Sequence, residues 1–139
     1  MSKKELAKKL NEELKNSSAK EVVEYFLGNF ENVALSSSLA VEDQVLTDLL
    51  LKTDKNAKIF TLDTGRLHPE TYDVMDATNL KYGIKIDVFF PQNDKVQELY
   101  QTQGINGHYE SIEKRKNCCN IRKIEPLTRA LKDVQVWIT

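Results

Sequence analysis

The sequence has few of the residues that define several common protein classes. Its 139 residues include two cysteines, three prolines and five glycines. The two cysteines are adjacent, Cys118 and Cys119, which excludes a disulfide framework and leaves reduced thiols or metal ligation as open alternatives. No apolar run approaches the roughly 20 residues of a membrane helix, and the N-terminus is charged, so we expect neither a membrane span nor a signal peptide. We therefore expect a cytoplasmic protein with no membrane contact.

Positive and negative side chains are nearly equal in number. The 20 Lys and Arg residues nearly balance the 21 Asp and Glu residues, so the net charge gives no reason to expect a nucleic acid partner. Hydrophobic residues make up 40% of the chain, which is enough for the core of one compact domain. We expect a single domain over residues 1–139, with N-terminal helices in 1–30 and a sheet with its crossover helices in 31–139.

The order of the expected elements indicates an α/β fold. Capping-box patterns at Ser2 with Glu5 and at Ser18 with Glu21 predict two amphipathic helices before the first strand. After them, strand and helix patterns alternate: strands at 33–35, 57–62, 84–90 and 134–139, and helices beginning near Val41, at Pro69 and at Asp94. This alternation predicts a doubly wound, mostly parallel sheet. Ligands of such sheets bind beyond the carboxyl ends of the strands, where the strand order reverses.

Two polar stretches follow predicted strands and are expected to face one crevice there. The first, Ser36 to Ser38, lies between a short strand and a helix N-terminus, an arrangement that suits a phosphate or a sulfate. The alternative is an ordinary turn in which a serine caps the helix. The second stretch is Asp63 to Arg66, where Gly65 supplies the turn. His68, just before Pro69, suits a capping position as well as substrate contact.

A third stretch, from Lys114 to Lys132, is locally basic. Seven of its side chains are Lys or Arg, opposed only by Glu125. The segment has no aromatic residue for base stacking, so the alternatives are a solvent-exposed helix face or a site for a compact anion. It also contains the two cysteines, for which buried thiols and cluster ligation both remain open. A four-iron cluster requires four protein ligands, and this chain has two cysteines.

These stretches together resemble the sulfonucleotide reductases, the adenylylsulfate and phosphoadenylylsulfate reductases. The resemblance covers essentially the whole chain, and it rests on three motifs: 36–43 (SSSLAVED), 62–72 (LDTGRLHPETY), and 118–127 (CCNIRKIEPL) leading to 137–139 (WIT). The paired cysteines are similar to those of the iron–sulfur branch that uses adenylylsulfate. The resemblance implies an adenine-nucleotide hydrolase-like fold.

The resemblance also implies a reaction and roles for individual residues. In that family a cysteine thiolate attacks the sulfate sulfur of the bound nucleotide, and thioredoxin, glutaredoxin or a related dithiol then releases sulfite. By position, Ser36, Ser37 and Ser38 would lie at the phosphosulfate, and Arg122 and Lys123 would neutralise it. Cys118 and Cys119 would be two of the four ligands of a 4Fe-4S cluster. The substrate-binding residues toward the nucleoside would be Leu62, Asp63, Thr64, Gly65 and Arg66.

Two departures from the family pattern bear on function. The family usually has Gly-Ala where this chain has Ala40-Val41, which affects how closely the loop approaches an anion. The family also continues beyond the position of Thr139 with a second cysteine pair and the nucleophilic cysteine. We therefore expect this chain alone to be inactive, to hold no cluster by itself, and to self-associate as a homo-oligomer. The competing interpretations are a non-catalytic nucleotide-binding or interaction module and an ATP pyrophosphatase-type adenylyltransferase.

Overall fold

The N-terminal part of the chain is helical. The computed structural model describes all residues, 1–139. Helices α1 (Lys3–Leu14) and α2 (Ala19–Asn29) both begin at the predicted capping boxes. In each box the serine accepts from the glutamate N–H, and the glutamate carboxylate accepts from the serine N–H at 2.7 Å. The two predicted helix starts are thus confirmed.

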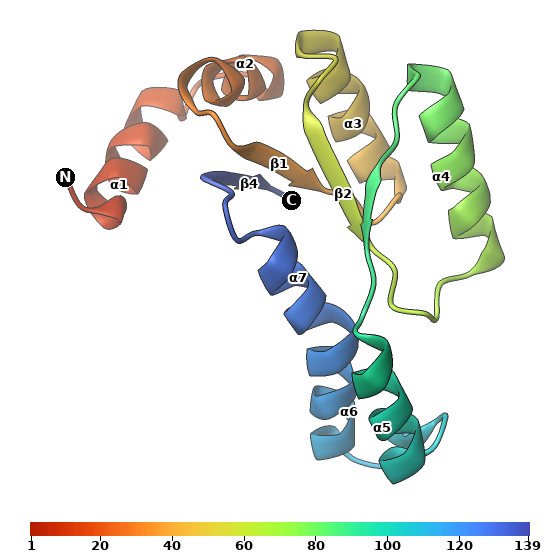
Figure 1. Cartoon of the computed structure of the whole chain (residues 1–139). Coiled ribbons are helices and arrows are strands. Elements are labelled where there is room, and N and C mark those ends of the chain that lie inside the picture. The colour runs from red at the N-terminus through yellow and green to blue at the C-terminus, as the bar shows by residue number, and fades with distance from the viewer.

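The centre of the molecule is a four-stranded parallel sheet in the order β3-β2-β1-β4 (Figure 1). Its strands are β1 (Val33–Ser36), β2 (Lys58–Leu62), β3 (Asp87–Phe89) and β4 (Val136–Ile138). Helix α3 (Val41–Thr53) joins β1 to β2, and α4 (Pro69–Tyr82) joins β2 to β3. Because β2 and β4 flank β1 on opposite sides, the strand order reverses at β1. The predicted doubly wound parallel fold is confirmed.

The last two strands are shorter than the sequence predicts. The apolar run at 84–90 predicts a strand, but Ile84 and Ile86 donate their N–H groups to the backbone and side chain of Asn79, at 3.1 and 2.9 Å. They therefore belong to the turn after α4, and β3 begins at Asp87. Similarly, the Val134 N–H is bonded to the Leu131 carbonyl, so β4 begins only at Val136.

Helices cover both faces of the sheet. On one face Leu35 of β1 and Ile59 of β2 pack against Leu50 of α3 and Val23 of α2 in the main hydrophobic core. Leu35 and Leu50 are completely buried, and burial of a leucine side chain contributes about 1.5–3 kcal/mol. On the other face, α7 (Glu125–Ala130) packs against β2 and β3. Packing on both faces thus fixes the position of the strands and of the loops that follow them.

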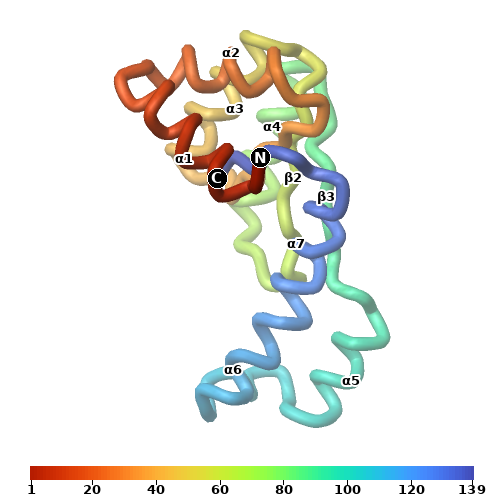
Figure 2. The backbone as a smooth tube through the Cα atoms, turned by 90° about the vertical axis from the view of Figure 1, so that its left-hand side faces the viewer, coloured from red at the N-terminus to blue at the C-terminus, as the bar shows by residue number.

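A helical arm extends away from the sheet, as both backbone views show (Figures 1 and 2). It consists of α5 (Asn93–Gln103), the short 3-10 helix η1 (Gly107–Tyr109) and α6 (Ile112–Cys119), which continues into the π-helix η2 (Asn120–Ile124). Leu99 and Gly107 are its only buried residues. The π-helix returns the chain to the sheet through α7. None of the helices is both long and apolar enough to cross a membrane.

Candidate functional site

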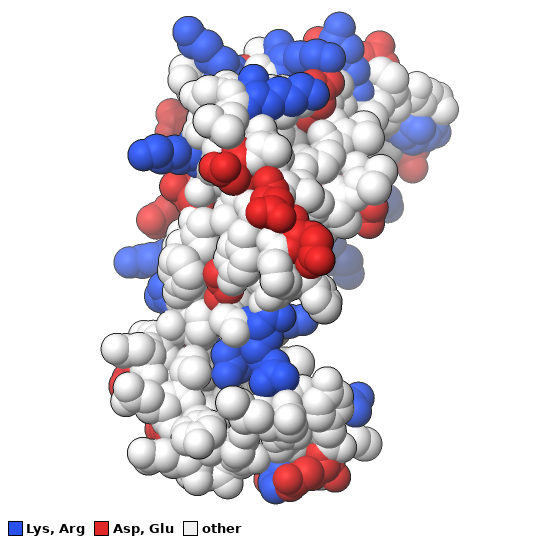
Figure 3. All heavy atoms as spheres, turned by 90° about the vertical axis from the view of Figure 1, so that its right-hand side faces the viewer, with Lys and Arg blue, Asp and Glu red and all other residues white.

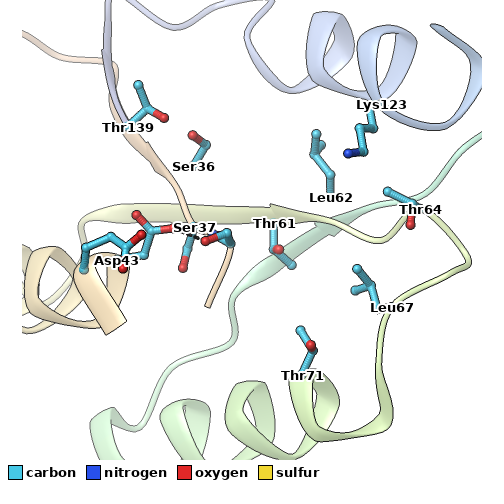
Figure 4. A pocket seen from close by; sticks show the side chains of 12 residues that line it. Ser36, Ser37, Asp43, Thr61, Leu62, Thr64, Leu67, Thr71, Lys123 and Thr139 are labelled. Atoms are coloured by element: carbon cyan, nitrogen blue, oxygen red, sulfur yellow. Dashed lines mark hydrogen bonds between the residues drawn. The ribbon is translucent and has the colours of Figure 1, made fainter. Parts of the chain in front are cut away.

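A cavity of about 510 Å³ lies beyond the carboxyl ends of β1, β2 and β4. We call it the serine cavity. It brings together six of the ten predicted substrate-binding residues, from three distant parts of the sequence (Figure 4). Its lining consists of Ser36, Ser37, Ser38, Glu42, Asp43, Thr61, Leu62, Thr64, Leu67, Thr71, Lys123 and Thr139. Of the stretch expected to face one crevice with the serines, Thr64 lines this cavity, whereas Asp63, Gly65 and Arg66 do not. Its volume is in the range of small-molecule sites.

The serine loop is held by hydrogen bonds within itself and to the sheet. Ser37 is buried and donates its N–H to the Phe60 carbonyl at 2.8 Å, which continues the β1–β2 ladder beyond the strand. Its hydroxyl accepts from the Leu39 N–H at 3.0 Å. The loop then enters α3 at Ala40, which has no side chain to cap the helix. No serine is therefore the N-cap of α3, and its first-turn N–H groups have no side-chain partner.

Asp43 is a part of this site that the sequence did not indicate. One of its carboxylate oxygens, Oδ2, accepts from both the N–H and the hydroxyl of Ser38, each at 2.6 Å. Asp43 is buried and lines the cavity in the first turn of α3. Two donors of the serine loop are thus already engaged by a carboxylate. The donors left for a ligand are the remaining hydroxyls and the free N–H groups of α3.

Lys123 is the only cation that lines the serine cavity. It comes from the π-helix η2, and Figure 4 shows its ammonium end directed toward the space beside Leu62. The cavity also contains the carboxylates of Glu42 and Asp43. Binding of an anion beside two carboxylates requires a compensating positive charge, which Lys123 alone supplies among these residues. π-helices occur frequently at functional sites.

The turn after β2 is shaped by Asp63 and Gly65. The buried Asp63 carboxylate accepts from the Gly65 N–H at 2.8 Å and from the Tyr72 hydroxyl at 2.7 Å. This bond to a carboxylate raises the pKa of Tyr72. Gly65 has φ +76°, and a Cβ there would lie 3.0 Å from Arg122 Nη1. Asp63 and Gly65 therefore hold the turn that presents Thr64 to the cavity, and neither lines it.

Arg66 and Arg122 line a different cavity. Arg122 donates to the Thr64 carbonyl at 2.6 Å, and Arg66 donates to the Ile105 carbonyl at 2.7 Å and to the Asn106 side chain at 3.1 Å. With Gly65 they border a hollow of about 720 Å³ on the far side of the Asp63–Leu67 turn, which we call the arginine cavity. Its other lining residues are Leu67, Phe90, Pro91, Asn93, Val96, Gln97 and Ile105. The role of Gly65, Arg66 and Arg122 in substrate binding remains a prediction.

The two cysteines lie outside the serine cavity. Both are half-buried at the end of α6, and Cys118 borders a small hollow of about 20 Å³ beside His108 and Arg122. Nowhere in residues 1–139 do three or more His, Cys, Asp or Glu side chains gather in a way that would hold a metal. A four-iron cluster needs four ligands. The donors of this chain therefore do not fit a complete cluster.

Trp137 is a second residue that the motif comparison did not assign to the site. Its indole N–H donates to the Ser36 hydroxyl at 2.8 Å, across the β1–β4 pair. Thr61 and Thr71 also line the cavity without having been predicted. The apolar run of β2 was a usable signal for Thr61, because a polar residue within a buried strand is uncommon in a core. His68 is the N-cap residue of α4, makes no side-chain capping bond and does not line the cavity.

The fold and the site together define a parallel α/β protein with a serine-lined cavity at the point where its strand order reverses. Residues 32–139 match the model of the phosphoadenosine phosphosulfate reductase domain, so the chain belongs to this family. It is 48% identical over 109 residues to an adenosine 5′-phosphosulfate reductase of Burkholderia cepacia, covering 78% of this chain and 44% of the relative. It is 39% identical over 135 residues to 5′-adenylylsulfate reductase 1, chloroplastic, of Arabidopsis thaliana, covering 97% of this chain and 28% of the relative.

The fold is shared with a solved structure of the same family. The crystal structure of phosphoadenylyl-sulfate reductase from Candida auris in a phosphate complex superposes with a TM-score of 0.79 at 22% identity. The superposition covers 98% of this chain and 65% of that one. The predicted adenine-nucleotide hydrolase-like fold is thus confirmed. The chain spans less than half the length of the two curated relatives described above.

Proposed function

We propose that this chain supplies the nucleotide site of a reductase in sulfate assimilation. The substrate is adenylylsulfate, or its 3′-phosphorylated form, and the products are sulfite and AMP, or adenosine 3′,5′-bisphosphate. The names of the relatives support adenylylsulfate. The observation that carries the proposal is the serine cavity, where three serines meet the single cation Lys123.

In this proposal the serine hydroxyls and the first-turn N–H groups of α3 donate to the phosphosulfate, and Lys123 neutralises its charge. Charged hydrogen bonds of this kind are about twice as strong as neutral ones. Leu62 and Thr64, at the end of β2, lie toward the nucleoside. Trp137 holds the Ser36 hydroxyl in place, and Asp43 does the same for Ser38.

The reaction of the family requires a thiolate at the sulfate sulfur. A new S–S bond forms as the S–O bond to the nucleotide breaks, and the nucleotide leaves as its phosphate. Neither Cys118 nor Cys119 lines the serine cavity. We therefore propose that the nucleophile is neither of them and that residues 1–139 alone do not form sulfite. Cys118 and Cys119 would be two of the four cluster ligands of a full-length reductase, and no step proposed here passes through that cluster.

The remaining parts of the proposal concern partners and location. A dithiol protein, thioredoxin or glutaredoxin, would attack the enzyme S-sulfocysteine and release sulfite. We propose a cytoplasmic homo-oligomer. A sedimentation measurement over a range of protein concentrations tests the oligomer, and a monomer at all concentrations would contradict it.

The experiment that tests the site is a calorimetric titration of the chain with adenylylsulfate and with AMP. Lys123→Ala is expected to weaken binding about 10- to 100-fold, because a hydrogen bond to a charged group contributes about 1.5–3 kcal/mol. Lys116→Ala is the matched control, since Lys116 is an exposed lysine of α6 that lies outside the cavity. It should change affinity less than about twofold, as expected for an exposed charge.

Three results would contradict the proposal. The first is the absence of saturable binding to a folded chain, and the second is an equal effect of both lysine substitutions. The third is magnesium-dependent hydrolysis of ATP without binding of adenylylsulfate, which would indicate a pyrophosphatase instead. Sulfite formation by the purified chain with a dithiol would contradict the assignment of the nucleophile.

A further inference from the structure

We infer that the arginine cavity is a second anion-binding site, separate from the serine cavity. Its ligand class is an organic phosphate or sulfate monoester, with the oxyanion on Arg66 and Arg122 and the organic group on the apolar wall. The inference does not depend on the function proposed above. It rests on charge, on unused hydrogen-bond donors and on the shape of the cavity.

The charged side chains that line the arginine cavity are both positive. Two guanidinium groups and two amide side chains, Asn93 and Gln97, border it, and no Asp or Glu does. The acidic side chains of α5 also lie outside the lining, and Glu98 is paired with Lys95 at 3.5 Å. Figure 3 shows a group of Lys and Arg side chains at the waist of this face of the molecule. The serine cavity, in contrast, has one cation and two carboxylates.

Hydrogen-bond donors at this cavity lack acceptors. Arg122 Nε is buried and has no partner, although Nη1 of the same side chain is bonded to Thr64. The Nε atom itself is enclosed by protein, so a ligand in the cavity would accept from the remaining Nη hydrogens of the two guanidinium groups. The N-cap of α5 is Gln92, which makes no side-chain capping bond. In the first turn of this 11-residue helix the Asp94 N–H is bonded to the Asn93 side chain at 2.7 Å, whereas the N–H groups of Asn93 and Lys95 have no side-chain partner. The helix dipole there adds to the positive potential of the two arginines.

The cavity has room for a ligand larger than an inorganic anion. Its volume is about 720 Å³, within the range of small-molecule sites. Leu67, Phe90, Val96 and Ile105 form the apolar part of the lining, which we call the apolar wall, and Phe90 and Ile105 are more than half exposed. Such a wall accepts an aliphatic or aromatic group attached to the anion. An ester with one oxyanion and one apolar group fits both parts of the lining.

The test uses phenyl phosphate and inorganic phosphate as probes in calorimetry and in amide NMR of the whole chain. Gln97→Glu places a negative charge in the cavity and should weaken phenyl phosphate at least tenfold. Gln97 is exposed and forms no hydrogen bond, so this variant is expected to fold normally. Gln101→Glu introduces the same charge on the same helix outside the cavity and should change affinity less than twofold.

Two further measurements separate the two cavities. Phenyl phosphate should bind Lys123→Ala as well as the unmodified chain and should shift the amide signals of residues 93–97. The fluorescence of Trp137, the only tryptophan, reports on the serine cavity through its bond to Ser36 and should stay unchanged at this second site. Inorganic phosphate should bind about tenfold more weakly than phenyl phosphate, because it leaves the apolar wall exposed.

The inference would be overturned by any of three results. They are no saturable binding of phenyl phosphate, equal effects of Gln97→Glu and Gln101→Glu, and loss of binding in Lys123→Ala. Equal affinity for inorganic and phenyl phosphate would overturn the assignment of an organic ester. Loss of AMP binding in Lys123→Ala, with phenyl phosphate binding intact, would support both this site and the function proposed for the serine cavity.

Discussion

Leu39 is the only residue other than glycine with a positive φ, and it lies in the loop that forms the serine cavity. Its φ is 64°, a conformation that costs a non-glycine residue roughly 1–2 kcal/mol. The side chain offsets this cost because it is buried in the main core with Leu35 and Leu50. The next residue, Ala40, has φ −74° and ψ 170°, which any residue adopts. The glycine that the family usually carries at position 40 is therefore not required for this backbone.

Ala40→Gly tests this conclusion. The glycine should lower the free energy of unfolding by about 0.4–1 kcal/mol, because it makes the unfolded chain more flexible. Ala40 is exposed and does not line the serine cavity, so the affinity for AMP should change less than about twofold. Urea unfolding and calorimetry measure the two quantities. A tenfold gain in AMP affinity would show instead that the methyl group of Ala40 limits approach to the anion.

At the same scale, the sequence predicted some functional positions and missed others for a physical reason. The serines and Lys123, which line one cavity, were predicted because strand ends and a local excess of positive charge are visible in sequence. Arg122 and Lys123 are neighbours in the chain, yet they line different cavities. Successive helical residues point roughly 100° apart, so a basic run does not reveal which residue faces which site. Trp137 depends on the β1–β4 pairing, which joins residues about a hundred positions apart.

At the scale of elements, helices α3 and α4 are joined by two polar contacts. Gln44 donates to Thr78 at 2.9 Å, and the Tyr82 hydroxyl donates to Asp48 at 2.6 Å. The bond to the carboxylate raises the pKa of Tyr82 to about 12, whereas hydrogen bonds from Lys52 and then Tyr82 lower the pKa of Asp48. The contribution of this α3–α4 contact to the free energy of unfolding therefore depends on pH.

The sign of this coupling follows from the direction of each shift. The Tyr82 contribution to stability is complete below its ordinary pKa of about 10 and is lost as the pH rises toward 12. The Asp48 contribution is present above its ordinary range near 4 and is lost in acid. Tyr82→Phe should therefore be less stable than the unmodified chain at pH 7 to 9, and the difference should shrink toward pH 12.

Urea unfolding at a series of pH values measures this difference. Tyr100→Phe is the control, since the Tyr100 side chain is exposed and forms no hydrogen bond. A difference between Tyr82→Phe and the unmodified chain that stays constant from pH 8 to 12 would contradict the coupling.

The types and order of the elements were predicted well, because hydrophobic period and capping residues are local properties. The start of β3 was wrong because the apolar residues at 84–86 are held by Asn79 of α4 rather than by β2. The π-helix was not predicted at all. Its sequence, NIRKI, is compatible with an ordinary helix, and it joins α6 to α7 without a break in helical backbone. The boundary of β3 thus depended on hydrogen bonds to a residue of another element, which the local hydrophobic pattern does not show.

At the scale of the whole molecule, the sheet layer and the helical arm differ in burial. The sheet carries most of the core residues, whereas α5, η1 and α6 together bury Leu99 and Gly107. Segments with few buried apolar contacts open locally at a lower free energy than the core. Leu99→Ala should therefore increase amide hydrogen exchange of α5 and α6 and leave β1 and β2 nearly unchanged.

Leu50→Ala is the matched substitution in the core of the sheet layer, where Leu50 is completely buried. It should lower global stability by about 2–5 kcal/mol and increase exchange throughout the chain. Both variants are compared by native-state hydrogen exchange. Equal acceleration of β1 and α6 in Leu99→Ala would show that the arm and the sheet unfold as one unit.

The position of β1 at the centre of the sheet has a consequence for the order of folding. Ala34 pairs with Lys58 on one side and with Trp137 on the other, which are 24 and 103 residues away. Closing the longer loop costs about 1.3 kcal/mol more in chain entropy than closing the shorter one. During synthesis from the N-terminus, β1, β2 and β3 have all emerged before Trp137 is translated. We therefore expect β4 to pair with β1 after β2 has done so, and until then the serine cavity lacks the bond between Trp137 and Ser36.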